Sequence, residues 1–229
     1  MKIAILGTGM VGQNLAPTLA RKGHHIMIGT RDVQKTLTKL EPHPFGMPSF
    51  GQWHKDHSDI PVATFTEAVA NSELLINATN GFAIIDILKA VPSASFDDKV
   101  MLDVANALDF SKGMPPRVGI TDTPGASIGE SLQAAFPKLR VVKSLNTLTS
   151  FAMLNPAAIP GGDSTLFMAG NDAAAKGIVL ELLRSFGWND VLDLGDISNA
   201  GATELMMPIW LRVFGKLGQS TVFNYKIAR

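Results

Sequence analysis

Three glycines near the start of the chain have the spacing Gly-x-Gly-x-x-Gly, in the segment Gly7-Thr8-Gly9-Met10-Val11-Gly12. An apolar run, residues 3–6, precedes them and a helical pattern follows. In that setting the first glycine permits a tight turn, the second lets the backbone approach a pyrophosphate, and the third lets helix and strand pack closely. The helix N-terminus would face the phosphates with its free N–H groups. The segment predicts a dinucleotide-binding site, and a glycine-rich structural turn is the alternative.

The end of the second apolar run should select between NAD and NADP. An NAD site places an acidic side chain there for the ribose 2′-hydroxyl, whereas an NADP site has small polar and basic groups. Thr30 and Arg31 follow the run, and Lys35 comes shortly after them. Asp32 has the usual spacing for the acid, but we expect it to cap the next helix instead. Because a hydroxyl, a guanidinium and an ammonium together form a phosphate clamp, these residues favour NADP(H).

Amide and hydroxyl side chains follow several of the later apolar runs. In an open parallel sheet the ligand lies beyond the carboxyl ends of the strands, where such groups can bond the carboxamide and ribose of a nicotinamide. Each residue taken alone could equally form a turn or cap a helix. As a set they favour the cofactor site, and the set comprises Thr79, Asn80, Asn106, Asn146 and Thr147, with Ala78 beside Thr79 as a further residue of the site.

Short apolar runs alternate with helical patterns through most of the chain. Near-continuous Val, Ile and Leu runs are typical of strands buried on both faces, as in parallel sheets. The alternation predicts an α/β fold: a Rossmann-type, doubly wound, mainly parallel sheet with a C-terminal helical extension. We expect one structural unit, in which residues 1–197 bind NADP and residues 198–229 form the extension. The expected strands are 3–6, 26–28, 61–65, 74–78, 100–104, 141–145 and 166–169.

Residues 41–59 interrupt this alternation with three prolines, two glycines and three histidines, and show little periodicity. A loop of this length in a compact domain is usually a lid or a binding loop. His43, His54 and His57 share the segment, but their spacing matches no recognised zinc pattern. We therefore expect a solvated loop with Trp53 against the core, and no metal site.

The tail after Ser198 carries apolar residues at helical spacing on more than one face of a single expected helix over 203–217. Pro208 should kink this helix near its start. This apolar surface is wider than one contact with the core would bury. We therefore expect a homodimer that uses the helix, with the partner subunit forming part of the wall of the substrate pocket. A fully buried helix in a monomer is the alternative.

Composition excludes several classes of function. Of 229 residues, 46% are apolar and 17% charged, and 20 Lys and Arg balance 20 Asp and Glu. Without a basic excess, we expect neither nucleic acid nor a membrane surface as partner. The chain has no cysteine, no signal peptide pattern and no apolar run long enough to span a bilayer, so we expect a soluble, cytoplasmic protein.

No general acid is evident in the sequence. The only tyrosine is Tyr225, so the Tyr-x-x-x-Lys pair of one reductase class cannot be assembled. Hydride transfer from a nicotinamide to a flavin-like ring needs stacked rings and excluded water rather than a protein proton relay. We therefore assign no catalytic side chain.

Six segments along the chain together resemble one family, and they are Gly7–Gly12, Gly23-His24, Gly29-Thr30-Arg31, Val142–Thr147, 170–173 and 194–199. The family is that of the deazaflavin-dependent NADP reductases and their bacterial relatives, which pass hydride between NADP and the 8-hydroxy-5-deazaflavin coenzyme (factor 420). A group of flavin-using metalloreductases shares the fold. The resemblance implies that Thr30, Arg31 and Lys35 hold the 2′-phosphate.

Several positions depart from the family pattern. Asn146 stands where the deazaflavin enzymes carry a histidine, and the segments Asn77–Gly81 and Asp103–Asn106 lack the apolar-Pro pattern of characterised members. These departures do not affect the expectation that the protein binds NADP(H). They leave two possible hydride acceptors, a deazaflavin and a flavin. The alternatives are a non-catalytic NADP(H)-sensing module and a reductase of a small carbonyl or imine.

Overall fold

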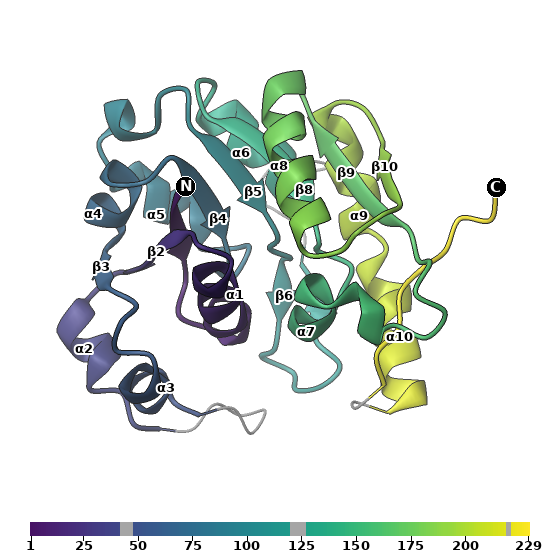
Figure 1. Ribbon diagram of the computed structural model, residues 1–229, viewed down its shortest axis with the longest axis horizontal. Helices are drawn as coiled ribbons and strands as arrows, with labels where there is room; N and C mark the ends of the chain where they lie inside the picture. The colour runs from purple at the N-terminus through teal and green to yellow at the C-terminus, as the bar shows by residue number, and fades with distance from the viewer. Residues whose placement is uncertain (42–47, 120–126, 219–220) are drawn as a thin grey trace.

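The computed structural model describes residues 1–41, 48–119, 127–218 and 221–229. An eight-stranded sheet runs through it in the order β10-β9-β8-β5-β4-β1-β2-β3, and a two-stranded hairpin, β6-β7, lies apart (Figure 1). Every neighbouring pair in the main sheet is parallel except β8 and β9. The strands are β1 (Lys2–Leu6), β2 (His25–Thr30), β3 (Val62–Thr64), β4 (Leu74–Asn77), β5 (Val100–Asp103), β6 (Leu108–Asp109), β7 (Arg117–Val118), β8 (Arg140–Ser144), β9 (Leu166–Gly170) and β10 (Val191–Asp193).

Helices cover both faces of the sheet, which makes the fold doubly wound as the sequence predicts (Figure 1). One buried cluster joins the sheet to α1, α3, α7 and α8, and a second joins its other face to α4, α5 and α6. The helices are α1 (Met10–Arg21), α2 (Val33–Leu37), α3 (Phe50–Asp56), α4 (Phe65–Ala70), α5 (Ile84–Lys89), α6 (Ile128–Ala135), α7 (Ser150–Leu154), α8 (Ala173–Ser185), α9 (Ala200–Glu204) and α10 (Met207–Leu217), with 3-10 turns at 93–96, 156–158 and 197–199.

All seven expected strands form, and six of them are largely buried on both faces, as their continuous apolar runs indicate. The exception is β3, which has three half-buried residues. Strand β10 and the hairpin strands β6 and β7 were not predicted. Each of these has two or three residues, and none of those residues is fully buried. Strands this short and half-exposed leave no apolar run to detect.

The expectation of a structureless loop over residues 41–59 is wrong for its second half. Ser49 caps α3 by accepting a hydrogen bond from the Gln52 N–H at 3.2 Å, and Phe50 and Trp53 bury one face of the helix. A helix of seven residues with only two apolar contacts carries too little periodicity to stand out. Trp53 does pack into the core, as expected. His43 lies outside the described residues.

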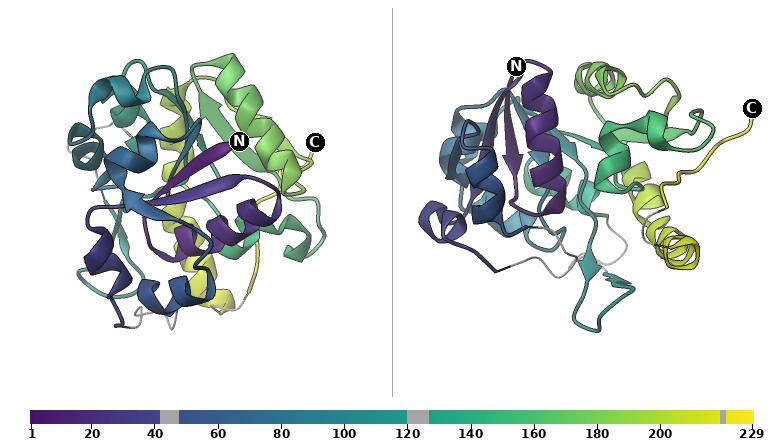
Figure 2. Two further views of the ribbon diagram at one scale, coloured as in Figure 1. Left: turned by 60° about the vertical axis from the view of Figure 1, so that its left-hand side comes forward. Right: turned by 60° about the horizontal axis from the view of Figure 1, so that its bottom comes forward.

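The tail forms two helices rather than the single kinked helix expected. A short turn at 205–206 separates α9 from α10, and Pro208 sits in the first turn of α10. Proline is tolerated there because the N–H it lacks would have no partner in the helix. The right-hand view of Figure 2 shows α10 and the segment around the hairpin projecting from the layered body.

Within the described residues, no helix is both long enough and apolar enough to cross a membrane.

Candidate functional site

The glycine segment turns tightly between β1 and α1. Gly7 has φ +123°, a backbone conformation that L side chains rarely adopt, and a Cβ there would lie 2.5 Å from the Ala78 carbonyl oxygen. A Cβ on Gly12 would lie 2.3 Å from the Gly7 carbonyl oxygen, so the start of α1 can approach β1 only without a side chain. Gly9 differs, because a Cβ there would meet nothing within 4 Å. The turn therefore leaves open space beside the backbone of Gly9.

Three adjoining pockets lie along the edge of the sheet where β1, β2, β4 and β5 end. The outer pocket, about 350 Å³, is lined by residues of β2, α4 and α5. The middle pocket, about 250 Å³, is lined by Gly7, Thr8, Gly9 and the ends of β2 and β4. The inner pocket, also about 250 Å³, lies between the ends of β4, β5 and β8 and helix α10. Neighbouring pockets share lining residues, so they form one groove.

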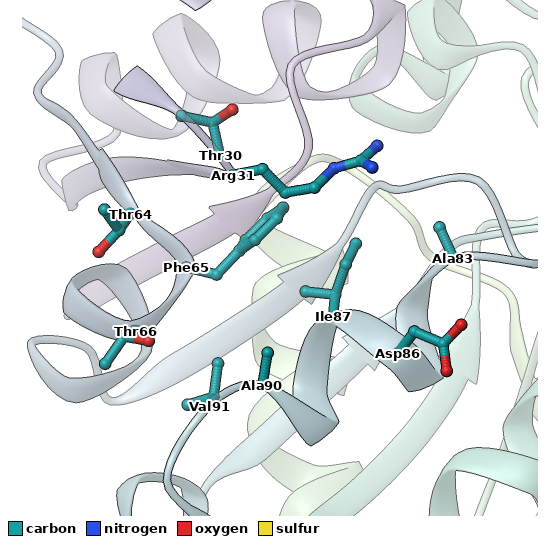
Figure 3. Close-up of a pocket in the computed structure, with 10 residues that line it drawn as sticks. All are labelled: Thr30, Arg31, Thr64, Phe65, Thr66, Ala83, Asp86, Ile87, Ala90 and Val91. Atoms are coloured by element: carbon teal, nitrogen blue, oxygen red, sulfur yellow. The ribbon is translucent and has the colours of Figure 1, made fainter. Parts of the chain in front are cut away.

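Thr30 and Arg31 line both the outer and the middle pocket. Figure 3 shows the Arg31 side chain extending from the end of β2 toward α5 in that view, with the ring of Phe65 nearby. The Thr30 hydroxyl lies 2.8 Å from the Thr36 hydroxyl, which ties the end of β2 to α2. Lys35 lies on α2 and is absent from the residues that line the three pockets. The guanidinium is thus the one cationic group of the expected clamp that the groove receives directly.

Asp32 caps α2, as expected. Its Oδ1 accepts a hydrogen bond from the Lys35 N–H at 2.9 Å, and its own backbone is extended. Asp32 is also absent from the residues lining the three pockets. A carboxylate engaged in capping is poorly placed to serve as the ribose acceptor of an NAD site.

The inner pocket gathers the predicted polar residues from three strand ends. Ala78, Thr79, Asn80, Asn106 and Asn146 all line it, and Val11 of the glycine segment lines it as well. Asn106 and Asn146 are bonded to each other in both directions, at 2.7 and 3.1 Å. Leu145, just before this pair, has φ +63°, a strained conformation for a leucine that turns the chain sharply as β8 ends.

Three of the remaining predicted residues do not line this groove. Thr147 is buried, with 2% of its surface exposed, and does not line any of the three pockets. Met10 and Gly12 begin α1 and likewise stand outside the lining.

The inner pocket is lined by polar amides and hydroxyls on one side and by apolar side chains on the other. The apolar side consists mainly of Leu148, Met153, Met207, Trp210 and Leu211. Among the described residues that line it, none has an ionisable side chain. The described part of its lining therefore offers hydrogen-bonding groups and apolar contacts but no titratable proton donor.

A buried ionic cluster that the sequence analysis did not single out lies behind this pocket. Lys143 of β8 is fully buried and pairs with Asp103 at 2.9 Å and with Glu204 at 2.8 Å. Burial alone lowers the pKa of Lys143, but the two carboxylates outweigh it, and the pKa is raised overall. The sequence does contain a sign of this cluster, because Lys143 directly follows the apolar residues Val141 and Val142. A lysine in a strand that is buried on both faces needs a charged partner.

The histidines of α3 make local contacts. A ring nitrogen of His54 lies 3.0 Å from the Ile60 carbonyl oxygen, and one of His57 lies 2.9 Å from that of Trp53. Within the described residues, no three His, Cys, Asp or Glu side chains come together as a metal site would require.

Comparison with known proteins places the chain in a family. Residues 2–107 match the family described as "NADP oxidoreductase coenzyme F420-dependent". A crystal structure from Arthrobacter sp. FB24, named as a candidate F420-dependent NADP reductase, is 45% identical, and the match covers 100% of both chains with a TM-score of 0.91. The chain belongs to the coenzyme F420-dependent NADP oxidoreductase family.

Two further relatives are less similar to this chain in sequence. The F420-dependent NADP reductase of Methanothermobacter marburgensis is 26% identical over 93% of this chain and 92% of its own length. The metalloreductase STEAP3 of Rattus norvegicus is 24% identical over 91% of this chain, which spans only 38% of that protein. The resemblance stated from the six sequence segments is thereby confirmed.

Proposed function

We propose that the protein transfers hydride between NADP(H) and a deazaflavin coenzyme of the F420 class. The observation that carries the proposal is the inner pocket: the described residues that line it supply amides, a hydroxyl and apolar side chains but no ionisable group. Transfer between two flat rings needs alignment and excluded water, whereas reduction of a small carbonyl also needs a proton donor. Two relatives whose names state this activity support the assignment.

The three pockets in a row would hold a dinucleotide in an extended conformation. The middle pocket would take the pyrophosphate against the backbone of Gly7, Thr8 and Gly9, next to the start of α1. The outer pocket would take the adenosine half, with Arg31 beside Thr30 positioned for the 2′-phosphate. The inner pocket would take the nicotinamide among Ala78, Thr79, Asn80, Asn106 and Asn146.

The remaining residues assigned from the sequence have supporting parts in this proposal. Met10, Val11 and Gly12 form the first turn of α1, whose dipole would stabilise the phosphates. Lys35 would add long-range positive charge from α2, and Thr147 would support Asn146 from within the core.

The two expected parts of the chain contribute different walls of the groove. Residues 1–197 carry the groove, and residues 198–229 close its inner end. Met207, Trp210 and Leu211 of α10 line the inner pocket opposite the strand ends. We propose that they form the apolar face on which the hydride acceptor stacks.

A homodimer through this extension is part of the proposal. Leu205, in the turn before α10, and Ile209, in the first turn of α10, are 75% and 54% exposed and lie four positions apart. Exposed apolar residues at that spacing favour contact with a second copy. Light scattering at micromolar concentration tests this, because a monomeric mass with full activity would refute it.

The acceptor is tested by following oxidation of NADPH with coenzyme F420, with free flavin and with a panel of ketones and imines. We expect rapid turnover with F420 and little with the small carbonyls and imines. Tight NADPH binding without turnover of any acceptor would instead favour a sensing module. Turnover with carbonyls or imines alone would contradict the proposal, because that reaction needs a proton donor and the described residues that line the inner pocket supply none that is ionisable.

A further inference from the structure

Lys143 makes a complete set of buried polar contacts. Its Nζ donates to Oδ2 of Asp103 at 2.9 Å and to the Ala105 carbonyl oxygen at 2.6 Å, and it pairs with Oε1 of Glu204 at 2.8 Å. An ammonium group has three N–H donors, so all of them are used. Neither Lys143 nor Asp103 has any exposed side-chain surface. The lysine is thus fixed in one place by two separate segments of the chain, residues 103–105 at the end of β5 and Glu204.

One side of this cluster leads to the polar side of the inner pocket. Oδ1 of Asp103 accepts a hydrogen bond from Nδ2 of Asn77 at 2.8 Å, and Oδ1 of Asn77 accepts one from the Thr79 hydroxyl, also at 2.8 Å. Thr79 lines the inner pocket. Ala105, whose carbonyl Lys143 bonds, lines it too and precedes Asn106. The ammonium therefore orders the loops that follow β4 and β5.

The other side of the cluster leads to the apolar wall. Glu204 is the last residue of α9, and its Oε2 also accepts a hydrogen bond from the Ile128 N–H at the start of α6, at 2.9 Å. Only two residues separate Glu204 from α10, whose Met207 and Trp210 line the inner pocket. Holding Glu204 therefore holds the beginning of α10.

We infer that Lys143 is a positioning residue which sets the spacing between the two walls of the inner pocket, by joining the strand-end loops to the α9–α10 segment through Asp103 and Glu204. The inference rests on the proposed function, since that spacing would decide how closely nicotinamide and acceptor approach. Buried ion clusters add little net stability compared with apolar packing of the same volume. Their directed contacts nevertheless specify a single arrangement, which is what a hydride-transfer slot requires.

Glu204→Gln and Lys143→Met test the inference. Glu204→Gln keeps the shape but places an amide N–H where a carboxylate oxygen accepts hydrogen bonds from Lys143 and Gly129 or from Ile128, so it weakens the links of α9 to β8 and to the start of α6. None of these four residues lines the three pockets, so the chain should fold and bind NADPH with unchanged affinity. We expect hydride transfer to F420 to slow by about ten- to a hundredfold, the effect of an ångström-scale misplacement. Amide exchange over residues 207–211, measured by mass spectrometry, should become faster. Lys143→Met leaves the buried Asp103 carboxylate without its cation, so we expect it also to lower the melting temperature, and Glu204→Gln decides the outcome if this variant does not fold.

Lys176→Met serves as the control. It breaks the ion pair of Lys176 with Asp193, and neither residue lines any of the three pockets. We expect wild-type transfer and wild-type exchange over 207–211 in this variant.

Hydride transfer by Glu204→Gln at the wild-type rate, or equal losses of NADPH affinity and turnover, would overturn the positioning role. The exchange measurement needs no turnover. Faster exchange over 207–211 together with an inactive wild-type protein would therefore refute the proposed function and leave the structural link standing.

Discussion

Asn106 and Asn146 bond each other in both directions across the ends of β5 and β8. Nδ2 of Asn106 donates to the backbone oxygen of Asn146 at 2.7 Å, and Nδ2 of Asn146 donates to Oδ1 of Asn106 at 3.1 Å. Asn146 follows Leu145, whose positive φ sets the direction of the chain. The pair presents a fixed arrangement of amide groups to the inner pocket. This rigidity is what positioning of a nicotinamide ring requires.

Asn106→Ala should therefore slow hydride transfer more than it weakens the fold. Two uncharged hydrogen bonds of about 0.5–1.5 kcal/mol each are lost, so we expect transfer to fall by about five- to a hundredfold. Single-turnover kinetics with saturating NADPH measures this directly. Asn71→Ala, which removes an amide bonded to the Glu67 carbonyl at the end of α4, is the matched control. Equal rates in the two variants would argue against a role for the pair.

Gly9→Ala and Gly12→Ala should fail in different ways. A Cβ on Gly9 meets nothing within 4 Å and its backbone is extended, so the free protein should keep its stability. The same methyl would occupy the space where a pyrophosphate approaches, and NADPH affinity should fall by at least about tenfold. Gly12→Ala should instead destabilise the fold, because its Cβ would lie 2.3 Å from the Gly7 carbonyl oxygen. Thermal melts and NADPH titration separate the two effects, and an unchanged affinity in Gly9→Ala would contradict the cofactor position.

Arg31→Ala should weaken NADP(H) binding selectively. Loss of a charge-assisted contact of about 1.5–3 kcal/mol corresponds to about ten- to a hundredfold in affinity. NADH lacks the 2′-phosphate, so its affinity should hardly change. Arg21→Ala on α1 controls for removal of a surface charge, because Arg21 lines none of the three pockets. Equal losses of affinity for both cofactors would contradict the assignment of Arg31 to the 2′-phosphate and would make Asp32 a candidate ribose ligand again.

His24 predicts an acid-sensitive contribution to stability. Burial, together with the nearby N-terminus and Lys22, lowers the pKa of His24 below its ordinary value of 6.5. Between that value and the lowered pKa the unfolded chain binds more protons than the folded one, so stability falls as the pH drops through this window. Urea melts from about pH 8 to about pH 5 should show a shallower fall for His24→Gln than for wild type. Parallel profiles would contradict the assignment, and His25→Gln controls for loss of the exposed neighbour.

The sequence predicted those features whose cause is local. Gly12 is required by the carbonyl of Gly7 five positions earlier, Gly7 by its own positive φ in the turn, and the cap by Asp32 follows from a helix start. The parallel sheet follows from continuous apolar runs that must be buried on both faces.

Features that depend on distant partners were not predictable in the same way. Lys143 meets Asp103 and Glu204 only because β5, β8 and α9 come together in the fold. The positions of Lys35 and Thr147 outside the groove depend on where the side chains of α2 and of the turn after β8 point after packing. Helix α3 was missed because two buried aromatic residues in seven do not make a detectable period.

The central claim is direct hydride transfer to a deazaflavin ring. In a single turnover with NADPH that carries deuterium at both C4 positions, we expect one deuterium at C5 of the reduced F420, detected by mass spectrometry. A hydrogen bonded to carbon does not exchange with water, so the label should persist there. Reduced F420 without deuterium, or no reduction despite bound NADPH, would contradict the account.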